Sequence, residues 1–228
     1  LGRPKVIHMI TNDRTKKYAM LMTLILFGTA LAGCLGTDDS DETETATAAP
    51  VVTDAGYTYA SNVDNHRALM KDLCDIKSAA SSDGGYDFAT AKDIYTNGKN
   101  AEKSDGSFRT LAGFASADGK NHGYDAYYNQ SGSVDAHIMA AMDGTGDFAG
   151  TSDTVRYQGI AKLTANMGMV AYTIHELNSA VAKADAGNVD NDSGAPHNWD
   201  EGWAFFHGPD EDWSCSPAYT MKKRAADY

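Results

Sequence analysis

Residues 153–186 carry the pattern that most restricts the fold of this chain. Their apolar side chains step by three and four positions without a miss, at Ile160, Leu163, Met167, Val170, Ile174, Leu177 and Val181. Steps of three and four bring side chains to one face of an α-helix, so the pattern predicts one long amphipathic helix. Ser152 is a natural N-cap for this helix, and Gly187 ends the run. We expect it to be the central element of the fold.

Shorter segments before the long helix show a similar helical periodicity. They span residues 62–80, 87–97, 107–114 and 134–142, and loops rich in Gly, Asn and Asp separate them. No segment shows a convincing alternation of apolar and polar side chains, which is the pattern of a half-buried strand. The sequence therefore predicts an all-α fold, an irregular helical bundle with long loops and one long central helix.

Residues 194–208 read Gly-Ala-Pro-His-Asn-Trp-Asp-Glu-Gly-Trp-Ala-Phe-Phe-His-Gly. Pro196 suits the first position of a helix, because its missing N–H would have no partner there. In a helix over residues 196–206, one face presents His197, Asp200 and Glu201. Three large aromatic side chains fall on another face, which we expect to be the buried one: Trp199, Trp203 and Phe206.

Imidazole and carboxylate groups at this spacing suit iron, manganese or zinc. Helical bundles commonly hold metals with Glu and His side chains that project inward from facing helices. On the long helix, His175 lies at the flank of the apolar stripe, and Glu176 points nearly opposite it. The spacing alone also fits a structural interpretation. In that case Asp200 and Glu201 pair with Lys or Arg, His197 caps its helix, and the His175–Glu176 pair is solvated.

The N-terminal residues have the layout of a secretory signal. A basic segment with Arg14, Lys16 and Lys17 precedes a mostly apolar run over residues 19–30, and Leu-Ala-Gly-Cys34 follows. Leu-Ala-Gly-Cys is also the lipobox of prokaryotic lipoproteins, so we expect Cys34 to carry a lipid that anchors the protein to a membrane. An ordinary signal peptide is the alternative. The predicted organisation is a leader and signal peptide over 1–33, a disordered acidic tether over 34–56, and a helical domain over 57–228.

Residues 34–228 hold 14 basic and 30 acidic side chains. A surface of this charge repels nucleic acid, so we expect no nucleic-acid partner. It attracts cations, although solubility in a salty medium explains the same charge.

Besides Cys34, the chain has only Cys74 and Cys215. Two thiols in an oxidising compartment usually pair, so we expect a disulfide between them, with two unpaired thiols as the alternative.

Several motifs in sequence order resemble the algal-type iron-assimilation proteins, which are also described as low-iron-inducible or high-CO2-inducible periplasmic proteins. The resemblance covers about residues 64–224 and is densest at 194–208; the other stretches are residues 93–100, 104–111, 146–150 and 172–177. It implies a secreted or surface protein that aids iron uptake and is not a known catalyst, so we do not expect an enzyme. It also implies that the family continues beyond the position of Tyr228, so we expect a C-terminal truncation here. The resemblance identifies iron as the metal, but it does not indicate which residues bind it.

Together these observations predict an extracytoplasmic, membrane-anchored lipoprotein that binds ferrous or ferric iron and passes it to an uptake transporter. We expect His197, Asp200 and Glu201 as ligands, completed by His175 and Glu176 from the facing long helix. One alternative is a metal-dependent hydrolase or oxidase with a metal-activated water beside Glu201. This sequence contains no recognised catalytic motif that would support such an enzyme. The other alternative is a non-catalytic surface interaction module.

Overall fold

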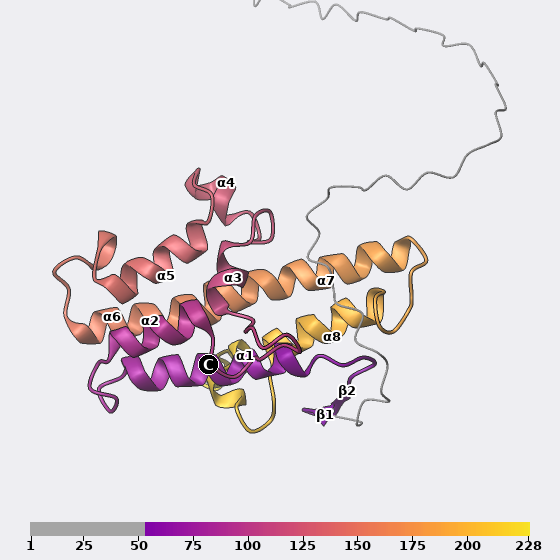
Figure 1. The fold of residues 1–228 in the computed structure, drawn as a ribbon, viewed down its shortest axis with the longest axis horizontal. Coiled ribbons are helices and arrows are strands. Elements are labelled where there is room, and N and C mark those ends of the chain that lie inside the picture. The colour runs from indigo at the N-terminus through magenta and orange to yellow at the C-terminus, as the bar shows by residue number, and fades with distance from the viewer. Residues whose placement is uncertain (1–52) are drawn as a thin grey trace, which may run out of the picture. The chain divides into compact units, whose positions relative to one another are not determined.

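Nearly all of the regular structure in this computed structural model is helical, which confirms the predicted fold class (Figure 1). The structure describes residues 53–228. The predicted signal peptide, the lipidation of Cys34 and most of the tether lie outside the described residues. Within the part that the structure describes, none of the helices combines the length and the apolar character that crossing a membrane requires.

The helices follow the predicted segments closely, with two additions. Their bounds are α1 (Asp64–Ala80), α2 (Phe88–Asn97), α3 (Leu111–Ser116), α4 (Tyr124–Tyr128), α5 (Ser133–Asp143), α6 (Asp153–Lys162), α7 (Val170–Asp185), α8 (Ala195–Phe206) and α9 (Pro217–Ala225). Two single turns of 3-10 helix accompany them, η1 (Gly146–Phe148) and η3 (Trp213–Cys215). Helices α4 and α9 were not predicted from the sequence, and α3 begins four residues later than predicted.

The predicted long helix is present, but its middle turns are wider than those of an α-helix. A π-helical segment, η2 (Leu163–Met169), joins α6 directly to α7. Because a π-helix bonds residue i to residue i+5, it turns the side chains that follow onto a different face. Val181, predicted to lie in the apolar stripe, is 55% exposed, whereas Glu176, predicted to point away from it, is 5% exposed. Both predictions assumed one unbroken α-helical register, and both are wrong for that reason.

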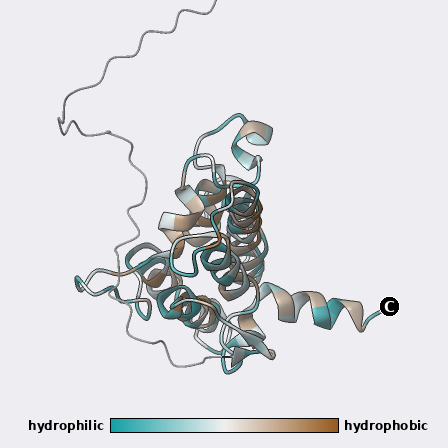
Figure 2. Cartoon of the chain, turned by 90° about the vertical axis from the view of Figure 1, so that its right-hand side faces the viewer, coloured by the Kyte–Doolittle hydropathy of each residue, from teal (hydrophilic) through white to brown (hydrophobic). Residues whose placement is uncertain are grey.

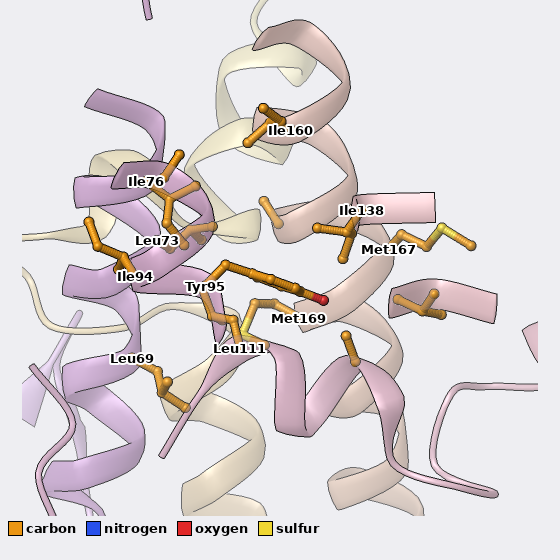
Figure 3. Close-up of a cluster of buried hydrophobic side chains, with 14 of the residues drawn as sticks. Leu69, Leu73, Ile76, Ile94, Tyr95, Leu111, Ile138, Ile160, Met167 and Met169 are labelled. Atoms are coloured by element: carbon orange, nitrogen blue, oxygen red, sulfur yellow. The ribbon is translucent and has the colours of Figure 1, made fainter. Parts of the chain in front are cut away.

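The apolar core lies between α1, α2, α3, α5 and the π-helical segment (Figure 3). It contains Leu69, Leu73, Ile76, Ile94, Tyr95, Leu111, Ile138, Ile160, Met167 and Met169, each at most 7% exposed. Removing a side chain of this size from water stabilises the fold by about 1.5–3 kcal/mol. The hydroxyl of Tyr95 donates to Asp135 Oδ1 at 2.8 Å, so this buried polar group has a partner. Phe205 of α8 belongs to the same core.

Helices α7 and α8 form an antiparallel hairpin and lie side by side in Figure 1. Gly202 lies at the contact between them. A Cβ at this position would lie 3.0 Å from Leu177 Cδ2 and 3.5 Å from Glu176 Cβ. A larger residue would therefore crowd the side chain of Leu177. This close contact brings side chains of α7 within reach of those on α8.

A small hairpin precedes α1. Strands β1 (Thr53–Asp54) and β2 (Tyr57–Thr58) pair in antiparallel fashion, and Asp54 is buried. Burial opposes the ionisation of Asp54, but hydrogen bonds from Arg67 and Tyr59 outweigh it and lower the pKa of this carboxyl. Residues 53–56, which were assigned to the tether from the sequence, form the first strand and the turn of this hairpin.

The predicted disulfide between Cys74 and Cys215 is present. It joins the middle of α1 to η3, 141 positions later in the chain. The last helix, α9, projects from the body of the domain (Figure 2). Apart from Pro217 at its start, its side chains are half-buried or exposed. The covalent link thus fixes the C-terminal segment to α1 just before α9 begins.

Candidate functional site

The predicted ligand face of α8 is its buried face. His197, Asp200 and Glu201 are at most 8% exposed, whereas Trp199 is 47% exposed. Trp203 and Phe206 are only half-buried, so the prediction that the aromatic face is buried is wrong. Phe205 fills the core instead, because it continues the row of His197 and Glu201 in steps of four.

A cluster of imidazoles and carboxylates forms where α1, α7 and α8 meet. Glu201 Oε1 lies 3.2 Å from His66 Nε2 on α1 and 3.2 Å from His197 Nε2 on α8. On α7, His175 Nε2 lies 3.9 Å from Glu176 Oε1. We call these five residues the His–Glu cluster. Four of the five are buried, and His175 is half-buried.

An amide connects the two carboxylates of the His–Glu cluster. Asn198 Nδ2 donates to Glu176 Oε2 and lies 3.4 Å from Glu201 Oε2. This bond holds the α7 carboxylate beside the α8 carboxylate. The structure thus brings together four of the five residues predicted as metal ligands.

Burial and mutual contacts set the charges of the cluster. Burial lowers the pKa of His66 to about 4, which makes this imidazole neutral near pH 7. Burial raises the pKa of Glu176 to about 8, and the neighbouring charge of Glu201 adds to this effect. Burial opposes ionisation of Glu201 too, but the hydrogen bond from His197 and the nearby His66 lower its pKa to about 2. The pKa of Glu201 is thus lowered and that of Glu176 is raised, so the cluster favours negative charge on Glu201.

Asp200, the fifth predicted ligand, contacts the segment that precedes α1. Its Oδ1 accepts from Tyr57 Oη at 2.6 Å. Its Oδ2 accepts from the backbone N–H groups of Ala60 and Ser61 and from Ser61 Oγ, at 2.7–2.8 Å. Four hydrogen bonds occupy this carboxylate. Its role in the described structure is therefore to hold residues 57–61 against α8.

These hydrogen bonds also set which nitrogen of His197 carries a proton. The single hydroxyl hydrogen of Ser61 goes to Asp200, so the 2.8 Å contact between Ser61 Oγ and His197 Nδ1 requires an N–H on Nδ1. In the neutral imidazole, Nε2 then presents a lone pair to the carboxylate of Glu201. Two lone pairs at 3.2 Å repel unless a proton or a metal cation lies between them. Fixing a ligand imidazole through its other nitrogen is typical of metal sites.

Substitution of Asp200 by Asn is expected to lower the free energy of unfolding by about 1–3 kcal/mol, because the amide cannot accept all four hydrogen bonds. Urea denaturation followed by circular dichroism measures this change. Asp118, which is exposed, gives the matched control Asp118→Asn, for which we expect no comparable loss. An Asp200→Asn protein that keeps its stability but loses a metal site would instead identify Asp200 as a ligand.

His66 was not among the ligands predicted from the sequence. This residue lies on the buried face of α1 with Leu69, Met70 and Leu73, at steps of three, four and seven. A single imidazole on an otherwise apolar face is a weak signal, since it also fits a core histidine that is simply hydrogen-bonded. Its Nδ1 is buried without a hydrogen-bond partner, which is uncommon for a purely structural histidine.

The donor spacing in the cluster is compatible with a metal. Neighbouring ligands around an ion with bonds of about 2.1 Å lie roughly 3.0–3.4 Å apart, and both Glu201–His distances are 3.2 Å. Within residues 53–228, however, no three His, Cys, Asp or Glu side chains are already arranged to hold one metal ion. Capture of a metal here therefore requires rotation of one or more side chains.

The family model described as low iron-inducible periplasmic protein matches residues 39–221, which include every residue of the His–Glu cluster. No curated protein and no solved structure matches this chain. The family description supports an extracytoplasmic location, and the Cys74–Cys215 disulfide fits the oxidising conditions found there. The chain belongs to the low iron-inducible periplasmic protein family.

Proposed function

We propose that this protein binds iron outside the cytoplasmic membrane and supports its uptake, with His66, His197 and Glu201 as the central ligands. The observation that carries the proposal is the shared contact of Glu201 Oε1 with two imidazole nitrogens, each 3.2 Å away. Two imidazoles and one carboxylate are the ligand set with which many non-heme proteins hold ferrous iron. We therefore propose the ferrous ion as the cargo that fits these three donors best.

Glu176 and His175 complete the proposed site from α7. Glu176 lies beside Glu201 through their common contact with Asn198, and His175 follows at the half-buried edge of the cluster. Asp200 moves from the ligand set to a supporting role, because it fixes the tautomer of His197 through Ser61. The proposal includes a lipid anchor at Cys34 and delivery to an uptake transporter, both of which rest on the sequence.

The family description names no catalytic activity, and the proposal requires none. The protein would hold the ion by ligand exchange and release it again. All three central ligands are buried, which would shield the bound ion from water and from other chelators.

Anaerobic titration with ferrous iron tests this function. The test uses residues 34–228 with the substitution Cys34→Ser. Binding is measured by calorimetry or by competition with a coloured chelator. We expect one saturable site, which His66→Gln and His197→Gln each weaken about 10–100-fold. The matched control is His137→Gln, since His137 contacts Ser133 and Tyr128 and lies outside the cluster. Absence of saturable binding, or an equal loss in the control, would contradict the proposal.

A further inference from the structure

A lysine from a distant loop lies against the α7 side of the His–Glu cluster. Lys120 Nζ donates to Tyr172 Oη at 3.3 Å and lies 5.7 Å from the centre of the Tyr172 ring. The rings of Tyr172 and His175 are 5.3 Å apart. Tyr172, His175 and Glu176 are spaced by three and four positions, so they share one face of α7. Lys120 therefore brings a positive charge to the face that carries two proposed ligands.

We propose that Lys120 is a built-in cation that balances the carboxylates of the iron-free site and competes with the incoming metal. This inference rests on the proposed function. A bound ferrous ion would add two positive charges beside the one that Lys120 already supplies. The resulting repulsion weakens iron binding and favours release, which a protein that passes on its cargo needs.

The charge of Lys120 reaches the cluster from this position. Its ammonium interacts electrostatically with both Glu176 and His175.

The loop that carries Lys120 is held in place at the next residue. Asn121 is 5% exposed, and its Oδ1 accepts from the N–H of Asp125 at 3.3 Å. Gly119 and Gly123 on either side have positive φ angles of 71° and 80°. The backbone is therefore fixed in a tight turn, which holds Lys120 against Tyr172.

Substitution Lys120→Met tests the competition directly. We expect the affinity for ferrous iron to rise about tenfold and the dissociation rate to fall, because a like charge beside the ion is removed. Lys120→Arg keeps the charge and should keep the wild-type affinity. The matched control is Lys92→Met, which removes a lysine that pairs with Asp143 on α5. Unchanged or weaker binding by Lys120→Met, with wild-type protein that binds iron, would overturn the inference and leave the proposed function standing.

A second measurement does not depend on iron. In the metal-free protein, Lys120→Met should lower the melting temperature more than Lys92→Met does, because the buried His–Glu cluster loses a nearby cation. Equal melting temperatures for the two variants would overturn the balancing role. Failure of both the wild-type and the Lys120→Met protein to bind iron would overturn the proposed function, and the competition with it.

Discussion

Glu201→Gln is expected to weaken ferrous iron binding by at least about a hundredfold while the helical fold is retained. The carboxylate is the contact that both His66 and His197 share, so its loss removes the donor at the centre of the proposed site. Glutamine has nearly the same shape and can still hydrogen-bond to an imidazole, but it lacks the negative charge that attracts the cation in a buried site. Anaerobic titration of the variant beside the wild-type protein measures the loss.

The matched control for this variant is Glu211→Gln. Glu211 is exposed and lies outside the His–Glu cluster, and its substitution also removes one acidic charge. We expect the control to bind iron as the wild-type protein does. If the two variants bind equally well, the iron site lies elsewhere in the chain. If Glu201→Gln unfolds the protein, as circular dichroism would reveal, the comparison moves to His66→Gln, which removes a ligand without removing a buried charge.

Loss of the Cys74–Cys215 disulfide is expected to lower the free energy of unfolding by about 3–5 kcal/mol. The bond closes a loop of 141 positions, and a long closed loop strongly restricts the unfolded chain. The disulfide also fixes α1 eight residues after His66, so a reduced protein should bind iron less tightly. Urea denaturation of the double variant Cys74→Ser with Cys215→Ser measures the change in stability.

A reducing agent provides the control for this prediction. It should destabilise the protein that contains both cysteines and leave the double variant unchanged. Equal unfolding midpoints for the wild-type protein and the double variant would show that the bond contributes little to stability.

The helices could be predicted from the sequence because each of them buries a stripe of side chains, and a stripe leaves a regular spacing. The prediction of the buried face was wrong for α8, because the large aromatic side chains of this helix were expected to pack into the core. The buried face there is polar, and its partners come from far along the chain. Tyr57 and Ser61 hydrogen-bond to Asp200, and His66 contacts Glu201. Spacing within one helix carries no information about such distant partners.

The candidate site was therefore predicted only in part. His197 and Glu201 are four positions apart on one helix, and this local pattern was visible. His66 lies 131 positions before His197 and became a candidate only when the fold placed α1 against α8. Asp200 shares the spacing of a ligand, yet its hydrogen bonds to residues 57–61 give it a different role. Residue type and spacing suggested the chemistry, and tertiary contacts determined which of these side chains lie together.

The π-helical segment between α6 and α7 sets the direction in which α7 presents its side chains. An α-helix advances by about 100° per residue, and the wider turns of η2 take up about one extra residue. Winding η2 as a regular α-helix, with every residue kept, would therefore rotate α7 by roughly 100° relative to α6. His175 and Glu176 would then turn away from α8, although every residue of the cluster would still be present. The winding of η2 thus determines whether α7 can contribute donors at all, whatever their identities.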